Sequence, residues 1–202
     1  MEKTLAKIIS TVFYPLMFPF WFILIAVNLP FYFSFIIPEK AKWLIIILTG
    51  LTTFVIPFVL IVIFGLGMKR LVKHAGKEER YLPYAVAAIF NFLTYYLLNQ
   101  VQLSPIFNLF NLGATTLLIL MLLITTIWNI SIFMAAAGAF FGAFLGISVI
   151  LGLNMNFILS TVLVLSGFIG YARLRLYKHS PAQIYTGFLL GAAVMFLHYY
   201  YL

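Results

Sequence analysis

Two basic segments of this sequence carry the side chains whose types and spacing could do chemistry. Lys73 and Arg80 lie seven residues apart in the first segment, and Arg173 precedes His179 by six residues in the second. Cations that converge at one surface bind a phosphoryl group, and arginine does so with a planar, bidentate fork. A histidine in that field could attack phosphorus and form a covalent phosphoenzyme, which water then cleaves. The residue types therefore predict a site for a phosphate group.

The same segments also have an explanation without function, because basic residues gather in the loops that follow membrane spans.

The sequence does not contain the residue types that several other catalytic chemistries require. The chain has no cysteine and no aspartate, and it has only four glutamates. Thiolate metal sites, two-metal phosphatase sites and paired-carboxylate hydrolysis are therefore excluded. We expect no metal and no cofactor.

The elements that must position these residues are membrane helices. The 202 residues are 65% hydrophobic and 8% charged, with a mean hydropathy of +1.14. Four runs without Asp, Glu, Lys or Arg cover residues 8–38, 43–68, 81–172 and 180–202. A helix that spans the bilayer needs about 20 apolar residues. This pattern excludes a water-soluble globular protein, a disordered chain and a β-barrel.

We predict an all-α, polytopic integral membrane helix bundle with six or seven transmembrane helices in a single domain, residues 1–202. The expected spans are 12–36, 43–67, 83–101, 109–128, 132–152, 155–172 and 181–201. The first span is the least regular, because its three prolines remove backbone hydrogen bonds. Small residues repeat at four-residue spacing in the fifth and seventh spans, where they let helix backbones approach closely. These repeats are Gly138, Gly142 and Gly146, and then Gly187 and Gly191.

The distribution of charge predicts the orientation and the partners. With seven crossings, ten Lys and Arg residues lie on one side of the membrane and only Lys40 and Lys42 on the other. The crowded side, which holds both basic segments, is expected to be cytoplasmic. The net charge of +8 does not indicate nucleic acid, because the cations sit in short loops between spans. The bilayer and its anionic lipid headgroups are the expected partners.

The order and spacing of these residues resemble the type 2 phosphatidic acid phosphatase superfamily, which is made of integral membrane phosphatases. Its three motifs are K-x6-R-P, P-S-G-H and S-R-x5-H-x3-D. Lys73 and Arg80 match the first motif, and Arg173 and His179 match the third. The best alignment of the second motif is residues 130–133, where Ser131 is retained. The resemblance to divergent bacterial members covers most of the chain.

The resemblance implies a role for each matched residue. His179 would be the nucleophile, and Lys73, Arg80, Ser131 and Arg173 would bind the phosphate. Gln183 stands where the family has the aspartate that orients the histidine, and Phe133 stands where it has a proton-donating histidine. A phenylalanine neither donates nor accepts a proton. An active protein is therefore expected to prefer a lipid diphosphate, whose leaving group is a weaker base, or to use His74 or Tyr177 as donor.

Three functions are compatible with this sequence. The first is hydrolysis of a lipid phosphate or diphosphate through a phosphohistidine. The second is a catalytically degenerate family member that binds anionic lipid or a membrane partner, which Phe133 and Gln183 favour. The third is a lipid flippase or transporter, although the predicted spans contain no charged residue of the kind that coupling sites use.

Overall fold

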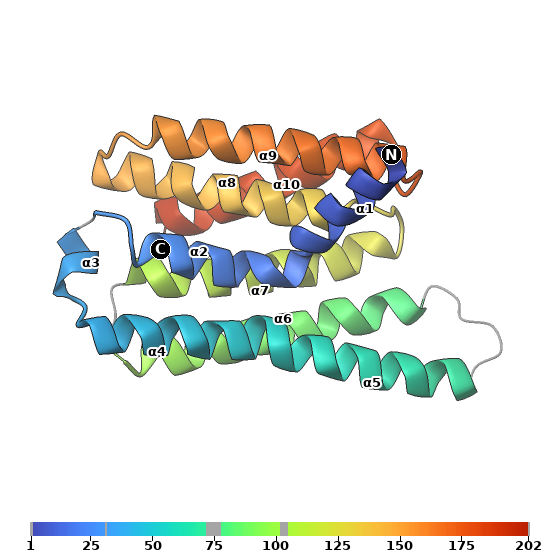
Figure 1. The fold of residues 1–202 in the computed structure, drawn as a ribbon, viewed down its shortest axis with the longest axis horizontal. Helices are drawn as coiled ribbons and strands as arrows, with labels where there is room; N and C mark the ends of the chain where they lie inside the picture. Colours follow the sequence, from blue (N-terminus) through green and yellow to red (C-terminus); the bar gives the residue numbers. More distant parts are fainter. Residues whose placement is uncertain (1, 31, 72–77, 102–104, 202) are drawn as a thin grey trace. The chain divides into compact units, whose positions relative to one another are not determined.

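The computed structural model describes residues 2–30, 32–71, 78–101 and 105–201, and the side chains of 32–33, 65–71 and 78–80 lie outside the description. The described residues form helices and turns, with no strand among them. The helical elements of this part are α1 (Glu2–Val12), η1 (Pro15–Met17), α2 (Phe18–Ala26), α3 (Tyr32–Ile36), α4 (Glu39–Gly50), η2 (Leu51–Val55), α5 (Ile56–Leu71), α6 (Glu78–Asn99), α7 (Pro105–Thr125), α8 (Ile132–Leu151), α9 (Asn156–Arg175) and α10 (Pro181–Tyr201) (Figure 1).

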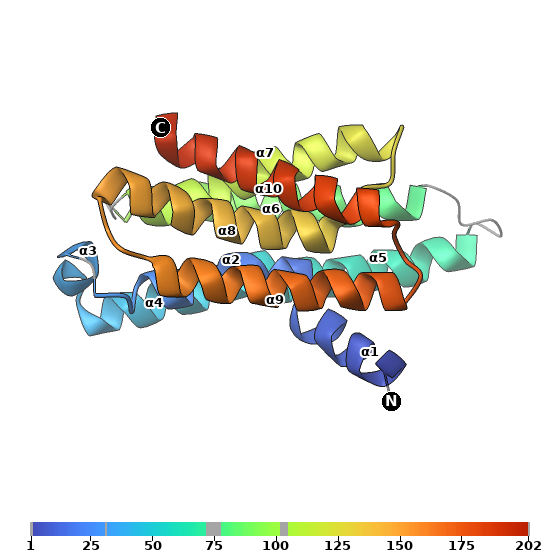
Figure 2. The ribbon, with the colours of Figure 1, turned by 90° about the horizontal axis from the view of Figure 1, so that it is seen from above.

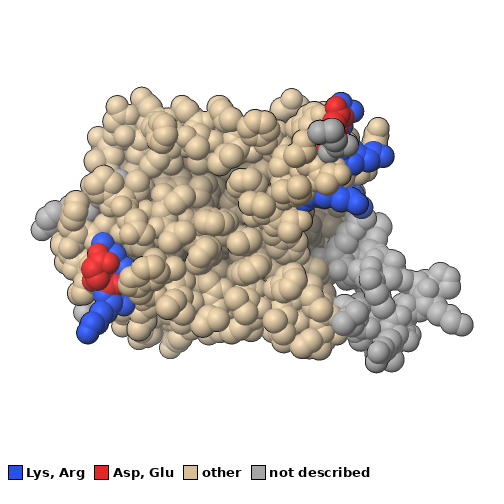
Figure 3. Space-filling view, viewed as in Figure 1, with Lys and Arg blue, Asp and Glu red and all other residues tan. Residues whose placement is uncertain are grey.

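The predicted all-α polytopic membrane bundle is confirmed. Seven helical segments among the described residues are long and apolar enough to cross a membrane. They are Glu2–Ala26, Glu39–Phe64, Tyr81–Asn99, Pro105–Thr125, Ile132–Leu151, Asn156–Arg175 and Pro181–Tyr201. On the face drawn in Figure 3, charged side chains gather at helix ends, and the surface along the helices carries none. The protein is an integral membrane protein.

The first span differs from the prediction. It covers Glu2–Ala26 instead of 12–36, and α3 forms a separate five-residue helix. Two causes are visible. Pro15 begins a short 3-10 turn that divides the span, because proline cannot donate a helical hydrogen bond. The residues before it form α1, which packs against α9 and whose Glu2 pairs with Arg175 at 3.2 Å.

The chain divides into two compact units, and each is described here by itself. Unit 1 comprises Met1–Phe18 and Leu123–Leu202, and unit 2 comprises Pro19–Leu122. Unit 1 contains α1, α8, α9 and α10, which lie side by side in both ribbon views (Figures 1 and 2). The expectation of a single domain stays a prediction.

Unit 1 is built on a close pairing of α8 with α10. A Cβ atom added at Gly191 would meet the carbonyl oxygen of Ala135, and one at Gly142 would meet that of Ala192. Contacts thus advance along both helices in the same direction, so α8 and α10 run parallel and begin at the same end. The glycine stripes let the two backbones touch. This packing determines which residues share the end of unit 1 where both helices start.

Unit 2 is held by aromatic stacking and by threonine hydrogen bonds. Phe22 of α2 stacks on Phe110 of α7, with ring centroids 4.2 Å apart. Helices α4 and α5 are joined through the π-helical turn η2, where the Thr52 hydroxyl accepts a 2.7 Å hydrogen bond from Thr94 of α6. Pro57 follows this turn, and a proline inside a helix removes a backbone donor, which accounts for the local widening.

Candidate functional site

The candidate site lies where three helix ends of unit 1 meet. The Ser131 amide, just before α8, donates a 3.2 Å hydrogen bond to the carbonyl of Gln183 in the first turn of α10. The last turn of α9 reaches the same place, because Arg173 lies over the ring of Phe133 in the first turn of α8. Helix N-termini carry partial positive charge. Two N-termini and an arginine therefore share this end of the unit.

Arg173 and its neighbour Arg175 point to different surroundings. The Arg173 guanidinium carbon is 4.1 Å from the centroid of the Phe133 ring. Arg175 is exposed and bonds outward, to the Tyr171 hydroxyl at 3.0 Å and to Glu2 of α1 at 3.2 Å. Arg175 thus ties α1 to α9, whereas Arg173 faces α8. Arg173, which the sequence predicts as a phosphate ligand, is thus the arginine that contacts Phe133.

Phe133 forms an aromatic platform under Arg173. A second ring, that of Tyr14, meets Phe133 edge-on, with centroids 6.1 Å apart and planes at 86°. A guanidinium over a ring face is attracted by the ring quadrupole, by about 0.5–2 kcal/mol depending on desolvation. The edge of a stacked guanidinium keeps its N–H donors available to an anion. The ring of Phe133 therefore supports the guanidinium of Arg173 and leaves its edge open.

Two buried polar groups at this end have no hydrogen-bond partner among the described residues. The Ser131 side chain is fully buried, and its hydroxyl bonds neither the first turn of α8 nor another group. The Nε of Arg173 is likewise buried without a partner. A serine at a helix N-cap normally accepts a hydrogen bond from the second or third amide of the helix. The start of α8 is thus left uncapped, with donors suited to an anion.

Gln183 caps α10. Its side-chain oxygen accepts a 3.0 Å hydrogen bond from the Ser180 amide, and its own amide lies 3.4 Å from the Ser180 hydroxyl. This reciprocal pair is a capping box, and Pro181 occupies the first helical position, which suits proline. The amide oxygen therefore has a structural use. Its predicted role in orienting His179 stays a prediction.

His179 lies in the tight connection between α9 and α10, directly before the cap residue Ser180, and it is partly buried. Helix α9 ends in a Schellman arrangement, in which Lys178 N–H bonds the Arg173 carbonyl and Tyr177 N–H bonds the Leu174 carbonyl. Tyr177 takes the left-handed position, with φ of 51°, which usually belongs to glycine. Because of this turn, only a short stretch of chain connects Arg173 to His179.

The other predicted site residues stay predictions. Lys73 and His74 lie outside the described residues. Arg80 is in the first turn of α6 in unit 2, and its side chain is outside the description. Across the described residues, no group of three or more His, Cys, Asp or Glu could hold a metal ion.

Sequence reasoning missed two residues of this end. Ser180 could have been found, because Ser-Pro-Ala-Gln before an apolar run has the spacing of a capping box. Tyr14 gave no usable signal, because its contact with Phe133 joins residues 119 positions apart, from 14 to 133. Only packing shows that the start of the chain contributes a ring here.

Comparisons with protein families, with curated proteins and with solved structures gave no match for this chain. The resemblance to the lipid phosphatases therefore stays an expectation from the motifs. The class that the fold defines is an all-helical polytopic membrane protein.

Proposed function

We propose that this membrane protein binds the phosphate group of an anionic lipid at the end of unit 1. One observation carries the proposal: Arg173 is held over Phe133 beside the uncapped start of α8, where its Nε and the Ser131 hydroxyl are buried without partners. A phosphate oxygen accepts hydrogen bonds from guanidinium, hydroxyl and helix-terminal amide groups alike. All three kinds of donor occur here.

The charge balance supports an anionic ligand. Among the described side chains, Glu2 pairs with Arg175 and Glu39 pairs with Lys42, so neither carboxylate neutralises Arg173. A partly buried cation without a counter-ion is unfavourable. A lipid phosphate from the surrounding bilayer would supply a negative charge that the described carboxylates do not give to Arg173. Lys73 and Arg80 stay predicted contributors to the same phosphate contact.

Hydrolysis through His179 is the second candidate. The spacing of Arg173 and His179 and the partial burial of the imidazole favour it. Two features favour binding alone: Phe133, which the motif alignment sets against the family's proton donor, can donate no proton, and the Gln183 amide caps α10. If hydrolysis occurs, a lipid diphosphate is the better substrate, because its leaving group needs less protonation.

The proposed location is a bacterial inner membrane, with the site at the cytoplasmic headgroup level. The Glu2–Arg175 ion pair joins the start of α1 to the end of α9, so the basic N-terminal segment and the second basic segment share one side of unit 1. A side rich in Lys and Arg is the cytoplasmic one by the positive-inside rule.

The binding proposal is tested with Arg173→Ala, with Arg175→Ala as the matched control. The purified full chain is titrated with dioleoyl phosphatidic acid and with dioleoyl phosphatidylcholine in detergent, and bound lipid is measured. We expect Arg173→Ala to weaken binding of phosphatidic acid by about tenfold or more, as for the loss of a hydrogen bond to a charged group. Arg175→Ala should change it by no more than about fivefold, as for a surface ion pair. Equal affinities for both lipids, or equal losses in both variants, would exclude the proposal.

Hydrolysis is tested separately by phosphate release from phosphatidic acid and from farnesyl diphosphate. Wild type, His179→Ala and the double variant Phe133→His with Gln183→Asp are compared. Release that His179→Ala abolishes, and that the double variant increases, is the outcome expected of a phosphohistidine mechanism. Absence of release in all three proteins, or release that survives in His179→Ala, removes the catalytic candidate.

A further inference from the structure

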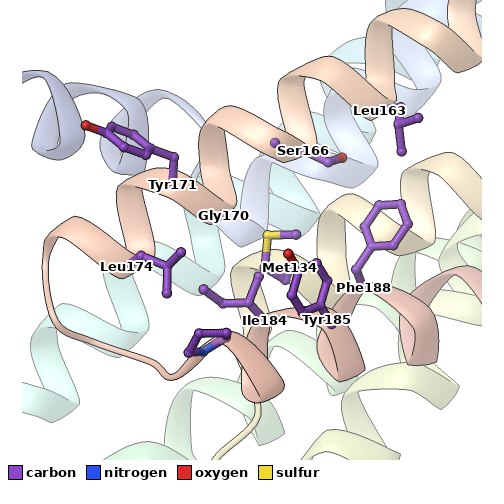
Figure 4. Close-up of a pocket in the computed structure, with 11 residues that line it drawn as sticks. Met134, Leu163, Ser166, Gly170, Tyr171, Leu174, Ile184, Tyr185 and Phe188 are labelled. Atoms are coloured by element: carbon purple, nitrogen blue, oxygen red, sulfur yellow. The ribbon is translucent and has the colours of Figure 1, made fainter.

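Unit 1 contains an apolar groove between α9 and α10, with α8 as its floor (Figure 4). Its volume is about 450 Å³, within the range of small-molecule sites. Leu174 and Ile184 face one another at one end, Met134 lies at the bottom, and Leu163 and Phe188 lie at the other end. Each of these residues belongs to a membrane-spanning helix. The groove therefore runs along membrane-spanning segments of unit 1.

The groove starts beside the candidate phosphate site. Arg173 precedes the lining residue Leu174, and Phe133 precedes the lining residue Met134. Since Arg173 and Phe133 are in contact, the apolar end of the groove and the phosphate site are built from consecutive residues of the same two helices. A ligand with a phosphate at one end and a hydrocarbon chain at the other would contact both.

The length of the groove matches one leaflet of a bilayer. Along α9 it extends from Leu163 to Leu174, a separation of eleven positions, which corresponds to about 16 Å at the helical rise of roughly 1.5 Å per residue. Half of the hydrocarbon core is about 15 Å. A lipid whose headgroup lies at the Arg173 end could thus keep a whole chain in the groove.

Three polar side chains lie at the groove, and one of them, Tyr185, has its hydroxyl in the groove beside Met134 (Figure 4). The Ser166 hydroxyl donates to the Val162 carbonyl at 2.7 Å. The Tyr171 hydroxyl points away from the groove and accepts from Arg175 at 3.0 Å (Figure 4). The surface that remains is formed by aliphatic, aromatic and thioether side chains and by glycine. Such a surface binds hydrocarbon and offers little to a polar ligand.

Gly167 leaves the groove open. A Cβ atom added there would have no neighbour within 4 Å, whereas one at Gly170 would touch Ile184 and Met134 at 3.4–3.5 Å. A larger side chain at Gly167 would thus enter free space without displacing the helices. This position allows the groove to be filled while the fold is kept.

We propose that this groove binds one hydrocarbon chain of the phosphorylated lipid whose headgroup contacts Arg173. The inference rests on the proposed phosphate-binding function and adds the place of the lipid chain. The occupant is a lipid of the surrounding leaflet, held at one end by charge and along α9 and α10 by burial of its methylenes. The groove then distinguishes lipids by chain length as well as by headgroup.

The test uses a phosphatidic acid with a photoactivatable diazirine midway along one acyl chain, and the matching diazirine diacylglycerol without phosphate. The full chain is purified, equilibrated with each probe and irradiated, and the labelled residues are mapped by mass spectrometry. Wild type is compared with Gly167→Leu, which fills the groove, and with Gly167→Ala, which makes the same change of backbone freedom but leaves most of the space open. Arg173→Ala is the fourth protein.

We expect phosphatidic acid to label the groove residues of α9 and α10 in wild type and in Gly167→Ala. Gly167→Leu should reduce that label by about tenfold, as expected when roughly two methylenes of the chain lose their burial. Arg173→Ala should reduce it too, and diacylglycerol should label the groove weakly in each protein. This combination supports the inference.

Three results overturn the inference, and the first two separate it from the phosphate proposal. If phosphatidic acid binds in an Arg173-dependent way but labels other spans, or labels the groove equally in Gly167→Leu, the groove is not the chain site while phosphate binding stands. If both probes label the groove equally and independently of Arg173, the groove holds ordinary bilayer lipid and the phosphate proposal fails as well. An unlabelled groove in wild type, as when a helix of a second copy fills it, also overturns the inference.

Discussion

Replacing Phe133 with leucine is expected to weaken lipid phosphate binding while the fold is retained. The ring lies 4.1 Å from the guanidinium carbon of Arg173, and leucine keeps the apolar volume but removes the face on which the guanidinium rests. A partly desolvated contact of this kind contributes about 1 kcal/mol. If that energy orients Arg173 for the phosphate, its loss raises the dissociation constant by about fivefold.

The assay is equilibrium titration of the purified variant with dioleoyl phosphatidic acid in detergent, beside wild type. Phe133→Tyr is the matched control, because it keeps an aromatic face at the same position, and its affinity should stay close to that of wild type. Thermal unfolding of each protein checks that the bundle is intact. Wild-type affinity in Phe133→Leu, together with a strong loss in Arg173→Ala, would refute the idea that the ring positions the arginine.

Three further predictions concern interactions within the two units. Gly191→Leu should lower the free energy of unfolding by at least about 1–3 kcal/mol, because the new side chain would clash with the Ala135 backbone of α8. The control Gly167→Leu places its side chain in open space and should unfold near the wild-type temperature. Equal shifts of the unfolding temperature in the two variants would contradict the close pairing of α8 and α10. Tyr177→Gly should stabilise the protein by up to about 1 kcal/mol. Relief of the left-handed strain at φ of 51° outweighs the greater backbone entropy that glycine has in the unfolded chain. Tyr177→Ala keeps the strain, so a gain of stability in that variant would contradict the reasoning. Thr94→Val should lower the free energy of unfolding by about 0.6 kcal/mol, because the 2.7 Å hydrogen bond to Thr52 is lost. A full unfolding titration in a mild denaturant measures this difference. Equal free energies of unfolding in the variant and in wild type would show that the bond is not stabilising.

The membrane architecture could be predicted from the sequence. Long uncharged runs dictate spanning helices, because the bilayer interior tolerates few other structures. Six of the seven expected spans lie within a few residues of their helices. The first span was misplaced because hydropathy alone does not show that α1, with its charged start, packs on α9 and ends before Pro15.

The glycine stripes show what sequence predicts about packing and where that prediction ends. Their four-residue spacing predicted close helix contact, and α8 and α10 are the pair that meets. The spacing did not reveal the partner or the parallel register. Both depend on how α9 connects and covers the two helices, which is a property of the whole unit.

The sequence by itself determined that the protein is helical, that it lies in a membrane, and which residue types could bind phosphate. Only the tertiary structure decided that Arg173 turns toward Phe133 while Arg175 turns toward Glu2, and that Gln183 caps its own helix. The physical reason is the range of each interaction. Hydropathy acts along a single segment, whereas the direction of a side chain depends on neighbours that packing brings from distant parts of the chain.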